Sequence, residues 1–226
     1  MYYMSIRKIN FVKGEFYHIY NRGNSKQKIF LDKNDYFHFM SLLYACNSIN
    51  YLKTENLTRT NDLTIYDFDQ NHNLVNIGAY CLMPNHFHIL ITEIEDGGIS
   101  KFMQKLTTAY VMYFNKKNKR TGGLFEGKFK SQYVANDIYL KYLFSYIHLN
   151  PIKLIQKNWK EKGIKNKNVS LRFLSQYSYS SYLDFTENSR QQNIILNLSL
   201  FPKYFPNTTS FKKEIFEWIN FKEILS

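Results

Sequence analysis

The stretch AYCLMPNHFHILI, residues 79–91, decides the fold. Two apolar runs typical of neighbouring strands flank the break at Pro84-Asn85, which predicts strands over residues 74–83 and 86–94. His86 and His88 are two residues apart at the start of the second strand, so their side chains point to the same face of the sheet. Two imidazoles on one strand face supply half of a metal site.

The flanking sequence predicts an α+β protein with a ferredoxin-like or RRM-like antiparallel sheet. Strand patterns at residues 16–23 and 129–134 and helical periodicity at 32–50 and 99–115 complete the order strand–helix–strand–strand–helix–strand. Helices pack on this sheet, and one more helix, over residues 136–150, follows it. We expect the domain to span residues 11–153 and a C-terminal extension of unknown role to span 154–226.

Three polar or weakly patterned segments interrupt or follow this scheme. Residues 54–73 form a polar insertion, which we expect to be a loop or hairpin. Residues 157–170 are rich in Lys and Asn, a composition that predicts a loop. The tail over residues 211–225 predicts a short amphipathic helix.

The extra helix carries a second candidate group. Tyr146 and Asn150 are four residues apart and share a face, and Pro151 ends the helix. A tyrosine nucleophile and a third metal ligand are therefore expected side by side, facing the histidine pair. An amide oxygen and a few waters favour Mg²⁺ or Mn²⁺ over a closed zinc site. The alternative is that Tyr142 and Tyr146 are core aromatics of an amphipathic helix.

The composition indicates a polyanionic partner. The 226 residues carry a net charge of +12, and residues 101–130 hold eight Lys or Arg against one acid. Aromatic residues make up 18% of the chain, which suits stacking on unpaired bases but also fits a large core. Cys46 and Cys81 lie within apolar patterns, so we expect both to be buried free thiols. Without a signal peptide or an apolar run of membrane-spanning length, we expect a cytoplasmic protein.

Four motifs in order resemble the REP-associated tyrosine transposase family, which belongs to the HUH-type single-tyrosine transposases. They are FYHIYNRG at residues 16–23, AYCLMPNHFH at 79–88, GLFEGKFK at 123–130 and YIHLNP at 146–151. The resemblance covers about residues 11–185. It implies cleavage of single-stranded, hairpin-bearing DNA through a 5′-phosphotyrosine intermediate, by a monomer or a homodimer.

The resemblance also implies residue roles. His86 and His88 would be metal ligands, Tyr146 the nucleophile and Asn150 the third ligand, although relatives often have Gln at that position. His148 lies on another helix face and is expected to be structural or DNA-facing. The residues expected to contact DNA are Arg22, Lys116, Lys117, Arg120, Lys128 and Lys130. For Arg22, Lys128 and Lys130 the alternative is a solvated surface charge.

Two other functions remain open from the sequence. A non-catalytic nucleic-acid-binding module could use the same scaffold, but it has no need for two histidines on one face opposite a Tyr-x-x-x-Asn helix. A metal-dependent hydrolase usually needs acidic ligands, and Glu93 and Glu95 do not share the strand face of His86.

Overall fold

The computed structural model describes residues 10–49, 64–67, 70, 72–186 and 190–218. These residues contain a four-stranded sheet in the order β2-β3-β1-β4, and every neighbouring pair is antiparallel. This is the strand order of a ferredoxin-like sheet, so the predicted fold class is confirmed. The strands are β1 (Phe16–Arg22), β2 (Val75–Met83), β3 (His86–Glu93) and β4 (Lys130–Tyr133).

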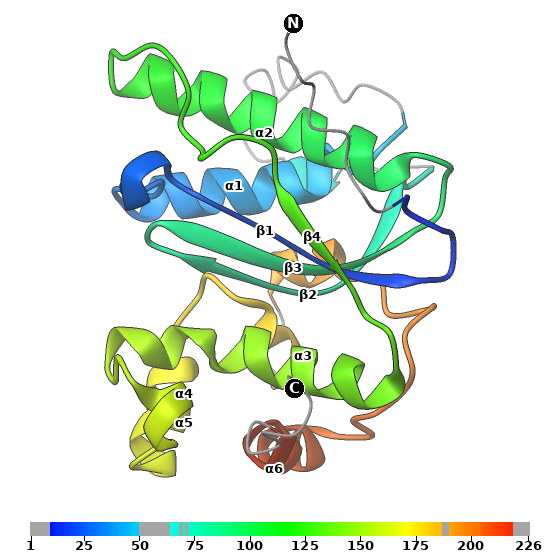
Figure 1. The fold of residues 1–226 in the computed structure, drawn as a ribbon, viewed down its shortest axis with the longest axis vertical. Helices are drawn as coiled ribbons and strands as arrows, with labels where there is room; N and C mark the ends of the chain where they lie inside the picture. The colour runs from blue at the N-terminus through cyan, green and yellow to red at the C-terminus, as the bar shows by residue number, and fades with distance from the viewer. Residues whose placement is uncertain (1–9, 50–63, 68–69, 71, 187–189, 219–226) are drawn as a thin grey trace, which may run out of the picture.

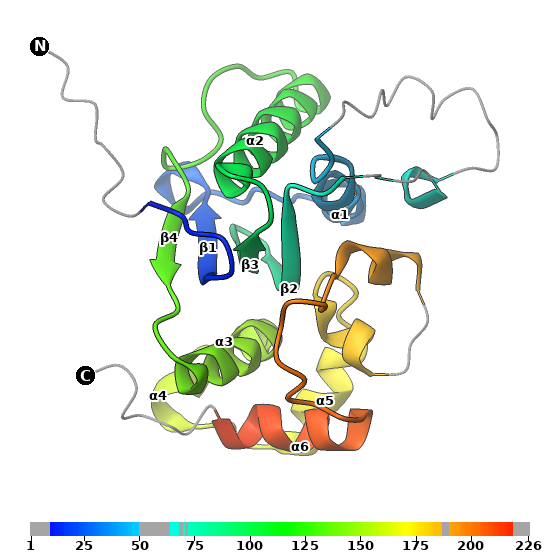
Figure 2. The same ribbon diagram turned by 90° about the vertical axis from the view of Figure 1, so that its right-hand side faces the viewer.

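Helices cover both faces of the sheet and give the molecule three layers (Figures 1 and 2). One face packs against α1 (Lys33–Ala45) and α2 (Gly98–Lys117), and the other packs against α3 (Asp137–Leu149). The remaining α-helices, α4 (Trp159–Lys162), α5 (Lys167–Leu174) and α6 (Thr208–Trp218), lie on the α3 side.

Side-chain alternation along β1 explains the two separate cores. Tyr17 and Ile19 are buried among the side chains of α1 and α2. His18 and Tyr20 alternate with them and therefore face α3 on the other side of the sheet. The layer between the sheet and α3 thus receives polar and aromatic groups, and the layer under α1 and α2 is a mainly hydrophobic core.

The first helix begins where expected but is shorter than expected. Asp32 caps α1 by accepting hydrogen bonds from the backbone N–H groups of Asn34 and Asp35. The helix ends at Ala45 and does not continue to residue 50. Asn47 causes this early end, because its side chain bonds both backbone groups of Val75, at 2.9 and 3.0 Å, and so ties the chain to β2.

The prediction of a loop over residues 157–170 is wrong. The segment contains α4 and the start of α5, with Trp159 fully buried and the Asn166 side chain capping α5. Most of the lysines and asparagines around them are exposed, and they hide the short apolar pattern in the sequence. In the tail, α6 begins at Thr208, and residues 219–225 of the expected helix lie outside the described residues.

Two smaller expectations have different outcomes. Most of the 54–73 insertion lies outside the described residues, which retain a 3-10 turn at Ile65–Asp67. Cys46 and Cys81 are buried free thiols, as predicted. In the part of the chain that the structure describes, no helix combines the length and the apolar character needed to cross a membrane.

Candidate active site

The histidine pair lies at the start of β3, on the sheet face that α3 covers. The β1–β3 register places His86 opposite Arg22 and His88 opposite Tyr20. Directly opposed residues of an antiparallel pair point to the same face, so the two imidazoles share their side of the sheet with Arg22 and Tyr20. The His86 and His88 ring centroids are 5.1 Å apart.

A third histidine, which the sequence analysis did not single out, completes this cluster. His18 Nε2 lies 2.8 Å from His88 Nδ1, and both side chains are buried. His18 comes from β1, diagonally across from His88. One signal in the sequence could have revealed it. His18 lies in the FYHIYNRG motif two residues before Tyr20, so the two side chains share a face of the strand.

Helix α3 brings the tyrosine to this cluster. The Tyr146 ring centroid lies 5.3 Å from that of His88 and 6.0 Å from that of His18, edge-on to both. Asn136 fixes the start of the helix by accepting a hydrogen bond from the Tyr139 N–H. The helix places Tyr146 against the sheet, half-buried at the edge of the core.

Asn150 follows one turn later and is oriented by the end of α3. Pro151 ends the α-helix at Leu149, but Asn150 keeps helical backbone angles (φ −55, ψ −38) as the chain tightens into a 3-10 helix, Asn150–Leu154. The amide therefore stays on the same face as Tyr146. Its side chain lies close to those of both His86 and Tyr146.

Two buried atoms at this site lack partners. His88 Nε2 and Asn150 Oδ1 are both inaccessible to solvent and make no hydrogen bond of normal geometry. Orphaned buried lone-pair atoms are costly unless a ligand or ion satisfies them. A set of two imidazoles and one amide oxygen, completed by water or phosphate oxygens, fits a divalent cation. Among the described residues, no group of three or more His, Cys, Asp or Glu residues could hold a metal ion.

The electrostatics of the cluster keep the histidines neutral at pH 7. Burial, with a smaller effect of Lys160, lowers the pKa of His18 to about 3. Burial and Lys153 lower that of His86 to about 4, and burial and the neighbouring His18 lower that of His88 well below 6.5. Neutral imidazole is the form that binds metals. Burial also raises the pKa of Tyr146 to about 12, so the resting phenol keeps its proton.

A lysine that the sequence analysis placed in a loop lies against the tyrosine. Lys160 Nζ is 3.8 Å from the centroid of the Tyr146 ring. Its neighbour Trp159 is buried in the cluster below α3 and anchors the short helix α4 there. No motif of the sequence indicated this contact, because it depends on how the C-terminal segment folds back onto α3.

The predicted DNA-contacting residues divide into two groups. Lys116, Lys128 and Lys130 are exposed, and Lys130 pairs with Tyr20 on the sheet next to the site. The others make contacts within the protein: Arg22 with Glu126, Arg120 with Gln27 and Gly123, and Lys117 with Asp32 and Asp35. Their role in DNA contact stays a prediction, as do the roles of His86, His88, Tyr146 and Asn150.

Comparison with known proteins assigns the family. A sequence model described as "Transposase IS200 like" matches residues 33–150, just over half of the 226-residue chain. The chain belongs to the IS200-like transposase family. A solved structure of "the REP associates tyrosine transposase bound to a REP hairpin" is similar at 15% identity and a TM-score of 0.46, over 80% of this chain and 85% of that one. No curated protein is significantly similar.

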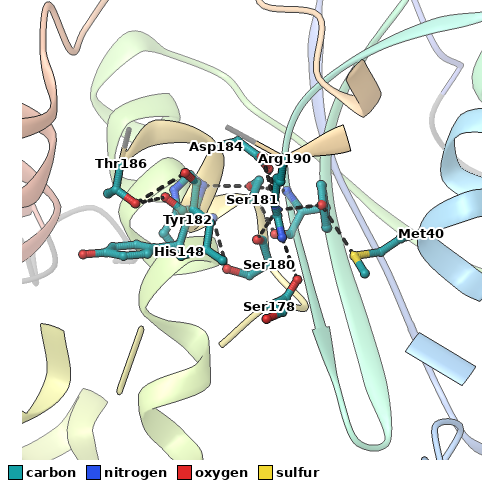
Figure 3. Close-up of polar contacts among 11 residues, drawn as sticks. Met40, His148, Ser178, Ser180, Ser181, Tyr182, Asp184, Thr186 and Arg190 are labelled. Carbon is teal, nitrogen blue, oxygen red and sulfur yellow. Dashed lines mark hydrogen bonds and ion pairs between the residues drawn. The ribbon is translucent and has the colours of Figure 1, made fainter. Parts of the chain in front are cut away.

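The match to the IS200-like transposases ends at Asn150, and a later segment of the chain contacts α3 through His148 (Figure 3). His148 Nε2 lies 2.8 Å from Ser181 Oγ, which also bonds the backbone N–H of Tyr80 on β2 at 2.9 Å. His148 is fully buried and is therefore structural, one of the two roles expected from the sequence. Ser181 links α3 of this transposase to β2 of its sheet.

Arg190 extends the hydrogen-bond network around Ser181. Its guanidinium pairs with the buried Asp184 carboxylate at 2.5 Å and donates to the backbone oxygens of Ser178 and Ser180 at 2.7 Å each (Figure 3). It also donates to the Tyr80 hydroxyl at 3.0 Å. These bonds hold the Ser178–Asp184 segment, and hence Ser181, in place against β2.

Proposed function

We propose that this transposase cleaves and rejoins hairpin-bearing single-stranded DNA through a covalent 5′-phosphotyrosine intermediate on Tyr146, with a divalent cation, Mg²⁺ or Mn²⁺. One observation carries the proposal. Tyr146 lies edge-on to His88, in a site where His88 Nε2 and Asn150 Oδ1 are buried without partners. A nucleophile next to two unpartnered atoms with metal-binding lone pairs suits metal-assisted phosphoryl transfer.

The reaction exchanges one phosphodiester for another. The Tyr146 hydroxyl oxygen attacks the scissile phosphorus in line, a new O–P bond to tyrosine forms, and the bond from phosphorus to the 3′ oxygen breaks. The phenol proton ends on the leaving 3′ oxygen, so the products are a 5′-phosphotyrosine and a free 3′-OH. A second 3′-OH later attacks the phosphotyrosine, rejoins the strand and returns the proton to Tyr146.

The residues around the tyrosine would position it and neutralise charge. A cation held by His86, His88 and Asn150 would polarise the scissile phosphate and offset its negative charge. The Lys160 ammonium lies over the Tyr146 ring and Lys153 is near His86, so both add positive charge where the phosphate would bind. The catalytic contribution of this site is therefore positioning and electrostatic stabilisation more than acid–base chemistry.

The DNA partner follows from the charge and from the motifs. The net charge of +12 and the exposed lysines Lys116, Lys128 and Lys130 favour a phosphate backbone near the open edge of the sheet. The resemblance to REP-associated transposases suggests that the strand carries a hairpin. We infer that residues 11–153 form the catalytic domain and that the extension, residues 154–226, holds α3 and supplies Lys160.

Strand cleavage tests the proposal directly. The full chain is incubated with 5′-labelled single-stranded hairpin DNA from repeated palindromes, with Mg²⁺, Mn²⁺ or EDTA, and the products are separated on a denaturing gel. We expect metal-dependent cleavage that Tyr146→Phe abolishes and that the matched control Tyr142→Phe, one turn earlier on α3, retains. Undiminished cleavage by Tyr146→Phe would refute the proposal. Binding of the hairpins without cleavage in either metal would favour the non-catalytic binding module.

A further inference from the structure

The hydrogen bonds of Asn85 determine which nitrogen of His86 carries the proton. Asn85 Nδ2 donates to the backbone oxygen of Lys26 at 3.2 Å, which fixes the orientation of the amide. Its Oδ1 then lies 2.7 Å from His86 Nδ1. A carbonyl oxygen only accepts, so His86 Nδ1 must be the donor. In a neutral imidazole this leaves the Nε2 of His86 unprotonated.

The contact between the other two histidines leaves two arrangements. His18 Nε2 and His88 Nδ1, 2.8 Å apart, share one proton. If His18 donated, His88 would carry its own proton on Nε2, an atom that is buried without an acceptor. An unsatisfied buried N–H is costly. If His88 donates from Nδ1, its Nε2 keeps a lone pair instead, like that of His86.

We propose that His18 is a positioning residue, which accepts the Nδ1–H of His88 and so keeps the Nε2 of His88 unprotonated, as a metal ligand must be. Asn85 does the same for His86. This inference rests on the proposed function, because it assigns His86 and His88 as the ligands. Metal-binding histidines commonly donate their second N–H to such a partner, which fixes the tautomer and the ring orientation.

The source of the positioning group distinguishes the two ligands. Asn85 directly precedes His86 in the turn between β2 and β3, so its effect is local in sequence. His18 reaches His88 from β1, and the β1–β3 register keeps the two rings on one face with their centroids 5.0 Å apart. His18 lies outside residues 33–150, the segment that matches the IS200-like family.

Nitrogen NMR of the metal-free protein tests the tautomers without any activity. In ¹⁵N-labelled full-length chain, protonated and unprotonated ring nitrogens of a neutral imidazole resonate far apart. We expect Nδ1 protonated and Nε2 unprotonated for both His86 and His88. In His18→Phe, which removes the acceptor, His88 should shift toward the Nε2-protonated form while His86 stays unchanged. An Nε2-protonated His88 in the wild type, or no change in His18→Phe, would overturn the inference.

Mn²⁺ affinity, measured by calorimetry on the same proteins, gives a second readout. We expect His18→Phe to weaken binding by about 10- to 100-fold. His18→Gln should bind nearly as tightly as the wild type, because its amide oxygen reaches the position of the imidazole Nε2 and still accepts. Equal affinity of His18→Phe and wild type would contradict the positioning role. A wild type that binds no Mn²⁺ would instead refute the metal in the proposed function, and the NMR result would still decide the tautomer.

Should His18→Phe fail to fold, His18→Gln and the wild-type spectrum keep the inference testable. His38→Phe is the matched control, because His38 stacks on Tyr113, 3.8 Å between centroids, on the opposite face of the sheet. This substitution should alter neither the His88 tautomer nor the affinity for Mn²⁺. A loss of affinity equal to that of His18→Phe would mean that general destabilisation explains both.

Discussion

Lys160 Nζ lies 3.8 Å from the centroid of the Tyr146 ring, so a cation from the C-terminal extension covers the proposed nucleophile. In the proposed reaction, a charge at this position would stabilise the phenolate that develops as the tyrosine loses its proton, and it would attract the phosphate under attack. In this account the extension therefore contributes to the proposed site in addition to supporting α3.

Lys160→Met should slow cleavage while leaving the fold intact. The substitution keeps most of the aliphatic side chain and removes the charge, and we expect a reduction on the order of tenfold in the single-turnover rate at saturating DNA. Lys162→Met, in the same short helix, is the control for a general change in charge. Equal effects of the two substitutions would show that Lys160 has no specific role.

Ser181→Ala should destabilise the protein and disturb the position of α3. The Ser181 hydroxyl bonds His148 Nε2 and the Tyr80 backbone, and both groups are buried. Leaving them without a partner should lower the free energy of unfolding by about 1–3 kcal/mol, measured by urea denaturation. Ser175→Ala removes an exposed hydroxyl and is the control, with an expected effect within about 0.5 kcal/mol. Unchanged stability in Ser181→Ala would contradict the linking role of Ser181.

Stability should fall as the pH decreases below 6.5, in part because of His148. Burial lowers the pKa of His148 to about 3 in the folded protein, whereas the unfolded chain protonates near 6.5. Between these values the unfolded state binds more protons, so the free energy of unfolding decreases by about 1.4 kcal/mol per pH unit for this group. The contribution of neutral His148 to the free energy of unfolding is fully present above pH 6.5.

The comparison with His148→Gln isolates this contribution. The glutamine amide still donates toward Ser181 but does not titrate, and the other groups change equally in both proteins. Urea denaturation at pH 7, 6 and 5, with EDTA present, should give a shallower pH dependence for the variant. Parallel pH profiles would show that His148 is not the titrating group.

Lys128 and Lys130 should contribute to DNA affinity and little to stability. Both are exposed, and we expect the double Gln variant to bind single-stranded hairpin DNA more weakly. The slope of log affinity against log salt should decrease by about 1.4 if both contact phosphates, since each contact to a single strand contributes about 0.7. Lys203→Gln with Lys212→Gln is the control pair near and on α6. An unchanged salt slope would remove Lys128 and Lys130 from the interface.

Lys117 should behave in the opposite way. Its ammonium lies 2.5 Å from the Asp35 carboxylate, which is fully buried, and it also bonds Asp32 at the start of α1. Lys117→Gln leaves the buried carboxylate without its counter-charge, so we expect lower stability and little change in the salt slope. A reduced slope with unchanged stability would restore the DNA-contact role expected from the sequence.

The sequence was sufficient to predict the sheet and its helices because each has a local signal. Alternation, Pro84-Asn85 and the Asp32 cap fix the strands and helix starts within a few residues. Family membership follows from the same local motifs. The end of α1 was not predictable in this way, because it depends on the hydrogen bonds between Asn47 and Val75, 28 residues apart.

The parts of the site that the sequence did not reveal depend on long-range contacts. His18 meets His88 across 70 residues, and this contact depends on the β1–β3 register, which no local pattern specifies. Lys160 reaches Tyr146 only because Trp159 is buried below α3. Arg22 was singled out by its charge and its place in the FYHIYNRG motif, and Lys117 by its charge. Their ion pairs with Glu126 and Asp35 could not be inferred without the fold.

The most direct test of the central claim locates the DNA adduct on the chain. The protein is reacted with a hairpin substrate whose 3′-OH fragment is short enough to dissociate, and the trapped adduct is digested with nuclease and protease and analysed by mass spectrometry. The account predicts a nucleotide on Tyr146 and none on Tyr142, whose ring stacks 6.1 Å away on the same helix. A nucleotide on any other residue, or cleavage that leaves no covalent adduct, would contradict it.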